Sequence, residues 1–389
     1  MNQPHLTSRL AGFGTTIFAE MSALALATGA INLGQGFPDT DGPAEVADAA
    51  IAAIKAGHNQ YPPGPGIPEL RHAIAQHQQH WYDLSFDPDT EILVTAGATE
   101  AMAAALIALC EPGDEIVMFE PYYDAYAAGI AIAGAHRRVV QLEPPDWTFD
   151  TNDLERAISG RTRAIVLNSP HNPTGKVFDR AELEAIAKVA IERDLIVITD
   201  EVYEHLTYDG TRHIPMATLP GMRDRTVTIS SAGKTFSFTG WKIGWVCASP
   251  ELLAAVRTAK QFLTYVNGAP FQYAIVTALG LPDSYFTELA ADLAARRDLL
   301  SEGLRRAGLQ VYETRGTYFI TVDIRSIGEA DGLGFCRDLP RRCGVVAVPS
   351  SVFYDDVEAG RSLVRFTFCK QRSVLTEAVT RIQSLGLAR

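Results

Sequence analysis

Cysteine is scarce in this sequence, and the cysteines that occur form no pattern. Five are present among 389 residues, with no CxxC spacing and no cluster of cysteine with histidine. An odd, scattered set of this kind argues against a disulfide framework and against a zinc site. The nine histidines show no pair at the spacing of metal ligands, so we expect no bound metal.

Long apolar stretches and basic blocks are also missing. The apolar runs are far shorter than the roughly 20 residues that cross a bilayer. The first residues, MNQPHLTSRLAGFGTT, lack the charged and apolar regions of a secretion signal. Lysine and arginine number 34 against 46 aspartates and glutamates, a net charge of −12, and form no dense block. We therefore expect a cytoplasmic protein that binds neither membranes nor nucleic acid.

What the sequence does contain is a regular alternation of strand and helix patterns. Hydrophobic residues make up 47% of the chain, enough for a large core. Between about 90 and 250, short β-rich runs alternate with helical patterns, which is typical of a mostly parallel sheet with helices on both faces. Seven strands are predicted, at 91–97, 115–120, 137–142, 163–170, 195–201, 226–232 and 242–249.

The chain changes character from about residue 285. A long helical pattern over 286–308 precedes two short strands, at 317–324 and 363–370, and a closing helix. This order favours a smaller α+β domain next to the large α/β domain. We expect an N-terminal segment at 1–45 that joins the small domain, a large domain at 46–284 and a small C-terminal domain at 285–389.

Polar and glycine-rich motifs follow four of the predicted strands. TAGATE follows the first strand, NSPHNPTG the fourth, TDEVY the fifth and SSAGK the sixth. In an open parallel sheet, ligands bind where the carboxyl ends of the strands meet. The coincidence of these motifs predicts one active site in the large domain.

Two of these motifs are consistent with a ligand site or with ordinary structure. Gly97, Ala98 and Thr99 lie at a strand-to-helix turn, where backbone N–H groups suit a phosphate but also occur at any capped helix. The motif SPHNPTG is either a rigid turn or a holder for the Asn172 amide, with a cis peptide at Asn172–Pro173.

Three charged side chains also have two interpretations. Asp200 ends an apolar strand and shares a face with Tyr203, either in a site or as a helix cap beside a core-edge ring. Lys234 is either a desolvated nucleophilic amine, part of a Ser-x-x-Lys motif with Ser231, or a surface lysine. Arg365 lies between apolar neighbours and either binds a carboxylate with its fork or extends to water.

Seven motifs, in one order over residues 32–368, resemble the class I pyridoxal-phosphate aminotransferases of fold type I. The branch that they resemble most holds the kynurenine/glutamine, methionine-type and actinobacterial N-succinyldiaminopimelate aminotransferases. Single motifs of this kind are weak signals, whereas seven in order are specific, and they cover nearly the whole chain. The motifs are NLGQGFPD, NQYPPGPG, GATEA, SPHNPTG, TDEVYEHL, SSAGKTFSFTGWKIGW and VRFTF.

The resemblance implies roles around the pyridoxal phosphate ring. Lys234 is similar to the lysine that forms the Schiff base and then moves the proton between the substrate Cα and the cofactor. Asp200 would pair with the pyridine nitrogen and keep it protonated. Tyr203 and Asn172 would hydrogen-bond the ring oxygen, and Tyr123 would stack on the ring face.

The resemblance also implies a phosphate site shared between subunits. Lys242 stands where many aspartate aminotransferase relatives have arginine, so it would act as a point charge. Tyr61 would reach the phosphate of the neighbouring subunit, which implies a homodimer. The phosphate-binding set would be Gly97, Ala98, Thr99, Ser231 and Lys242, with Tyr61 of the second subunit.

The implied substrate site is less sharply defined. Arg365 would bind the α-carboxylate, helped by the Gly36 backbone and by Asn172. Phe18 stands near the place where kynurenine-type members have tryptophan, which weakens the prediction of an aromatic substrate. Tyr265 would complete the pocket across the dimer.

The implied reaction is a ping-pong transfer of an amino group from an L-amino acid to a 2-oxo acid, with N-succinyldiaminopimelate and 2-oxoglutarate as one substrate pair. Two alternatives stay open at this point. One is a broad glutamine, methionine or aromatic range with cysteine-conjugate β-lyase side activity. The other is an aminotransferase-like effector domain of a transcription regulator, which the acidic charge and the early start of the enzyme-like region disfavour.

Overall fold

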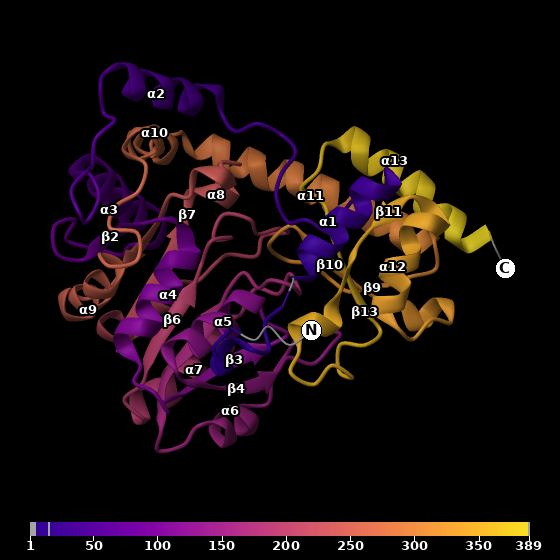
Figure 1. The fold of residues 1–389 in the computed structure, drawn as a ribbon, viewed down its shortest axis with the longest axis horizontal. Coiled ribbons are helices and arrows are strands. Elements are labelled where there is room, and N and C mark those ends of the chain that lie inside the picture. The colour runs from indigo at the N-terminus through magenta and orange to yellow at the C-terminus, as the bar shows by residue number, and fades with distance from the viewer. Residues whose placement is uncertain (1–4, 15, 388–389) are drawn as a thin grey trace.

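The computed structural model describes residues 5–14 and 16–387 of the chain. A large seven-stranded sheet occupies one side of the molecule, and two small sheets lie on the other (Figure 1). The large sheet has the strand order β2-β8-β7-β6-β5-β3-β4. Its strands are β2 (Ile92–Thr95), β3 (Glu115–Glu120), β4 (His136–Gln141), β5 (Thr162–Asn168), β6 (Ile196–Asp200), β7 (Thr226–Ser231) and β8 (Gly244–Cys247).

All seven predicted strands are confirmed within a few residues, and the sheet is mostly parallel. β3 to β7 pair in parallel, whereas β8 pairs antiparallel with both β2 and β7. Successive residues of β3 belong to opposite faces, because side chains alternate along a strand. Val117 joins one core cluster and Met118 the other, so apolar cores cover both faces of the sheet.

Helices supply these cores. On one face α4 packs against both α5 and α9, whereas α6 and α7 contribute to the core on the other. α2 and α10 pack together, with α3, over the β2 edge. The helices are α2 (Ala44–Lys55), α3 (Pro68–Tyr82), α4 (Gly97–Leu109), α5 (Asp124–Ala133), α6 (Thr151–Ala157), α7 (Arg180–Glu192), α8 (Ala232–Thr235), α9 (Pro250–Lys260) and α10 (Ala269–Leu279).

The C-terminal part of the chain forms a four-stranded sheet with the order β12-β13-β10-β9. The N-terminal segment packs on this part of the molecule: β1 (Ile31–Asn32) pairs in parallel with β11 (Val345–Val346) in a separate two-stranded sheet, and α1 (Ile17–Thr28) packs on α12 (Gly332–Cys343). The proposed domain boundary at residue 284 falls in the first turn of α11. The other elements are β9 (Gln310–Val311), β10 (Phe319–Asp323), β12 (Val348–Pro349), β13 (Leu363–Thr367), α11 (Asp283–Arg306) and α13 (Arg372–Gln383).

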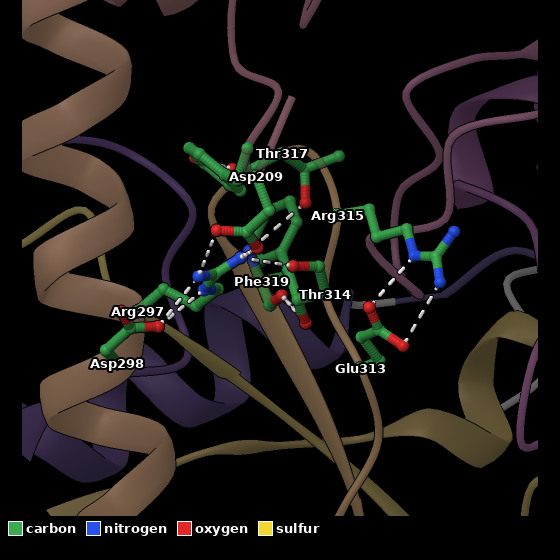
Figure 2. A network of polar contacts seen from close by, with 9 residues as sticks. Asp209, Arg297, Asp298, Glu313, Thr314, Arg315, Thr317 and Phe319 are labelled. Atoms are coloured by element: carbon green, nitrogen blue, oxygen red, sulfur yellow. Dashed lines mark hydrogen bonds and ion pairs between the residues drawn. The ribbon is translucent and has the colours of Figure 1, made fainter. Parts of the chain in front are cut away.

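A polar network ties α11 to two loops (Figure 2). Arg297 of α11 donates to Asp209, in the chain after β6, and to the carbonyl of Thr314 before β10. The Thr314 hydroxyl donates in turn to the carbonyl of Phe319, at 3.0 Å. The network therefore holds the start of β10 in place, and Phe319, the first residue of β10, lines the candidate site.

Shorter 3₁₀ turns connect the larger elements. They lie at Ser8–Leu10, Met216–Thr218, Arg223–Arg225, Thr239–Trp241, Ile324–Ile327, Ser350–Phe353 and Ser384–Leu387. Among the described helices, none combines the length and the apolar character needed to cross a bilayer. All five cysteines are free thiols.

Candidate active site

A cavity of about 460 Å³ lies at the carboxyl ends of the parallel strands. The ends of β2, β5, β6 and β7 each supply a motif to its wall, as the sequence predicts. Arg365 of β13, in the four-stranded sheet, and Phe18 of the helix α1 line its other side. Of the predicted site residues, the cavity brings together Phe18, Gly36, Gly97, Ala98, Thr99, Tyr123, Asn172, Asp200, Tyr203, Ser231, Lys234, Lys242 and Arg365.

One end of the cavity is suited to an anion. α4 begins there after Ala96, whose methyl group cannot cap the helix, so the first backbone N–H groups face the cavity without a side-chain cap. Lys242 Nζ lies beside this turn, 3.5 Å from where a Cβ on Gly97 would stand. A Cβ on Gly244 would lie 2.6 Å from the Gly97 carbonyl carbon, so only glycine allows this close approach. We call the set Gly97, Ala98, Thr99, Ser231 and Lys242 the anion cradle.

A buried carboxylate lies deeper in the cavity. Asp200 ends β6, and burial raises its pKa. Tyr126 donates its hydroxyl to Asp200 Oδ2 at 2.6 Å, and the Val202 N–H donates to Oδ1 at 3.3 Å; both bonds favour the ionised form. Tyr126 was not predicted to belong to the site, although its position three residues after Tyr123, in the first turn of α5, was the available signal.

The lysine of the SSAGK motif lies close to this carboxylate. Burial lowers the pKa of Lys234, while Cys369 and Asp200 act in the opposite direction. Its Nζ lies 5.8 Å from the centre of the Tyr203 ring and 5.9 Å from that of Tyr318. A lowered pKa makes the unprotonated, nucleophilic amine more accessible near neutral pH.

The arginine on the opposite wall has only neutral hydrogen-bond partners among the described residues. Arg365 is 1% exposed, and burial lowers its pKa to about 10. Its Nη1 donates to Asn172 Oδ1 at 2.8 Å and its Nη2 to the Gly34 carbonyl at 3.1 Å, whereas Nε has no partner among the described residues. A buried cation with neutral partners and an unpaired donor suits an incoming carboxylate.

Aromatic rings surround this arginine. The guanidinium carbon lies 4.0, 5.0 and 5.2 Å from the ring centres of Phe319, Phe353 and Phe18. Phe319 and Phe353 were not predicted, because no spacing in the sequence relates them to Arg365. The Asn172–Pro173 peptide is cis, as the SPHNPTG motif suggested, and the Asn172 oxygen faces Arg365.

Two predicted residues lie outside the cavity. Tyr61 is 80% exposed and Tyr265 52% exposed, and neither lines the cavity wall. Their rings contact each other edge to face, with centres 5.4 Å apart. The two residues thus form an aromatic pair on the surface.

Comparison with known proteins gives a consistent result. The sequence profile for aminotransferase class I and II matches residues 28–382. A probable N-succinyldiaminopimelate aminotransferase of Mycobacterium tuberculosis is 52% identical, over 97% of this chain and 98% of that protein. The methionine aminotransferase of Escherichia coli is 39% identical, over 97% and 98%. The solved structure of N-succinyldiaminopimelate aminotransferase from Mycobacterium tuberculosis superposes with a TM-score of 0.95, at 52% identity, over 98% of this chain and 100% of that one.

Proposed function

This chain belongs to the class I and II aminotransferase family, which uses pyridoxal phosphate, and we propose that its amino donor is N-succinyldiaminopimelate. The supporting observation is the 52% identity to a relative of that name over nearly the full length of both proteins. The methionine aminotransferase is similar over the same span but at 39% identity. The 2-oxo acid acceptor in this proposal is 2-oxoglutarate.

The donor set of the cavity fits pyridoxal phosphate. The anion cradle would hold its phosphate, Tyr123 would lie against its ring, and Tyr203 and Asn172 would donate to its ring oxygen. Asp200, an ionisable group at the cavity wall with Tyr126 behind it, would hold a proton on the ring nitrogen. When bound, the cofactor withdraws electrons from the substrate Cα.

The side chains of this protein would then orient the substrate and move one proton. Arg365 binds the α-carboxylate with its fork, and the aromatic rings around it exclude water. Lys234 Nζ takes the proton from the substrate Cα and returns it on the cofactor side. Since Arg365 lies on β13 of the four-stranded sheet and Lys234 on α8, which follows β7 of the large sheet, the substrate would be held between the two parts of the molecule.

We also propose a homodimer with shared active sites. The surface pair Tyr61 and Tyr265 does not reach its own cavity, and Phe262 and Leu263 beside Tyr265 are 82% and 46% exposed. An exposed apolar group of this kind favours a protein partner, and a second copy would bring Tyr61 to its phosphate. The cytoplasmic location and the division into segments 1–45, 46–284 and 285–389 stay predictions.

A panel of amino donors tests the proposed substrate. We expect the highest kcat/KM with N-succinyldiaminopimelate, measured against glutamine, methionine and kynurenine with 2-oxoglutarate as acceptor, and against glutamate with a different 2-oxo acid, since glutamate and 2-oxoglutarate give no net reaction. A higher value with methionine or kynurenine would contradict the proposal and favour the broad-specificity alternative. Pyruvate and ammonia released from a cysteine conjugate would report the β-lyase side activity.

The variant Lys234→Ala separates the chemistry from the substrate question. It removes the amine that moves the proton but leaves the anion cradle and Asp200 in place. We expect the variant to fold and to bind the cofactor, with transamination reduced by orders of magnitude for every donor. Near-normal turnover would refute the role of Lys234 whichever donor proves best.

A further inference from the structure

A pair of side-chain amides lies behind the anion cradle, outside the cavity. Asn267 is in the loop between α9 and α10, and Gln272 is in the first turns of α10. Gln272 Nε2 donates to Asn267 Oδ1 at 2.8 Å, and Gln272 is 1% exposed. Neither residue lines the cavity, so the proposed reaction leaves this pair without a role.

Asn267 binds both segments that carry the anion cradle. Its Nδ2 donates to the Thr95 carbonyl at 2.8 Å and to the Lys242 carbonyl at 3.1 Å. Thr95 is the last residue of β2, and its hydroxyl donates to the carbonyl of Gly97 at 3.1 Å. One amide therefore holds the start of α4 and the segment of the phosphate lysine at a fixed separation.

Lys242 needs such a restraint because its backbone is left-handed, with φ +56°. A side chain other than glycine adopts this conformation at a cost of about 1 kcal/mol or more, so the surroundings must hold it. The hydrogen bond from Asn267 to the Lys242 carbonyl restrains the backbone next to this strained torsion. Without it, the residue can relax, and the ammonium group moves away from Gly97.

The other end of the amide pair reaches the surface tyrosines. Gln272 Oε1 accepts the backbone N–H of Ile67, at 2.9 Å, at the end of the loop that carries Tyr61. The buried Lys260 Nζ donates to the carbonyls of Gly64 and Tyr265. Hydrogen bonds from Gln272 and Lys260 therefore connect the loops of Tyr61 and Tyr265 to the segments around the anion cradle.

We propose that Asn267, braced by Gln272, is a positioning residue for the anion cradle. It sets the place of Lys242 relative to the start of α4 and so controls how tightly a phosphate group is held, without touching the phosphate. The inference rests on the proposed function, since it takes the anion cradle to bind the phosphate of pyridoxal phosphate.

The test compares two ligands that differ only in the phosphate. Pyridoxal phosphate and pyridoxal are titrated into the full chain freed of cofactor, and their dissociation constants are measured by absorbance. Asn267→Ala is the main variant, and Asn267→Leu, of similar volume, is the second. The matched control is Asn152→Ala, an exposed asparagine of α6 that lies outside the cavity and whose amide donates to the nearby Asp150. Lys242→Met alone, and combined with Asn267→Ala, completes a double-mutant cycle.

We expect Asn267→Ala to raise the dissociation constant of pyridoxal phosphate about tenfold, which corresponds to about 1.4 kcal/mol. The dissociation constant of pyridoxal should change less than about twofold. In the Lys242→Met background the same substitution should have little effect, because the group that it positions is gone. An unchanged affinity in the Asn267 variants, with Lys242→Met still weakened, would overturn the inference and leave the proposed function intact. If Lys242→Met also binds normally, the phosphate role of Lys242 fails as well. An equal loss in both backgrounds would show that Asn267 does not act through Lys242.

Discussion

Removal of the Tyr126 hydroxyl tests whether hydrogen bonds keep Asp200 ionised, as its proposed role requires. Tyr126→Phe deletes the 2.6 Å hydrogen bond to Asp200 Oδ2 and leaves the longer bond from the Val202 N–H to Oδ1. A hydrogen bond to a charged group contributes about 1.5–3 kcal/mol, and a loss of about 2 kcal/mol corresponds to about thirtyfold in an equilibrium constant. We therefore expect kcat/KM for transamination to fall about thirtyfold.

The pH dependence gives this prediction its sign. Burial raises the pKa of Asp200, and the hydrogen bond from Tyr126 is the largest influence that lowers it. Without the hydroxyl the pKa rises further, so at low pH more of the carboxyl is neutral and cannot hold a proton on the cofactor ring. The rate deficit of the variant should be largest at low pH and should shrink as the pH rises.

Steady-state rates between pH 6 and 9, with the absorbance spectrum of the holoenzyme, measure this effect. Tyr122→Phe is the matched control, because the Tyr122 hydroxyl donates to Asp355 at 2.5 Å outside the cavity. The control should retain the normal pH profile. A Tyr126→Phe enzyme with an unchanged kcat/KM and an unchanged profile would refute the role of Tyr126.

Three further predictions test other parts of the molecule. Arg365→Lys keeps the charge but loses the fork that reaches Asn172 and Gly34 together, so kcat/KM should fall about a hundredfold, or about 3 kcal/mol, with an unchanged cofactor spectrum; an unaffected KM for amino acids would contradict the carboxylate role. Burial raises the pKa of Glu204 from 4.5 to about 7, so the ionised side chain destabilises the fold as the pH rises through this range. Glu204→Gln should therefore stabilise the protein by about 3 kcal/mol at pH 8 and have little effect below pH 4.5. Equal shifts in the denaturant midpoint at the two pH values would rule this out. A mixture of Tyr61→Ala and Lys234→Ala subunits, refolded together, should regain activity that neither has alone, because one site of each mixed dimer is complete; no gain on mixing argues against shared sites.

The sequence predicted the strands because each carries its own signal. β3 and β6 are short apolar runs flanked by polar turns; the predicted and observed bounds agree for β3 and differ by one residue at each end of β6. The motifs at the strand ends met in one cavity for a topological reason, since parallel strands place their carboxyl ends at one edge. The direction of β8 was outside this reasoning, because a β-rich run has the same pattern in either orientation.

Contacts between distant segments could not be predicted in the same way. The rings of Phe319 and Phe353 meet Arg365 only after the small sheet has formed, and Asn267 meets Thr95 across 172 positions of the chain. His77 and His205 show the same limit: their Nε2 atoms lie 2.7 Å apart, although 128 positions separate them. Such pairs depend on how whole elements pack, and the local spacing of residues does not predict this packing.

The charges of the active site are arranged so that a ligand completes them. Arg365 is buried with neutral partners, Lys234 has a lowered pKa, and the first N–H groups of α4 lack a side-chain cap. Each of these features costs stability in the free protein, since buried charges and unmade hydrogen bonds are unfavourable. In the proposed function, the cofactor would supply a phosphate and a carbonyl carbon and the amino acid a carboxylate, and together they would satisfy all three. If Lys234, Arg365 and the anion cradle hold cofactor and amino acid as proposed, binding of both would offset this cost, and the folded state should be stabilised more by both than by either alone.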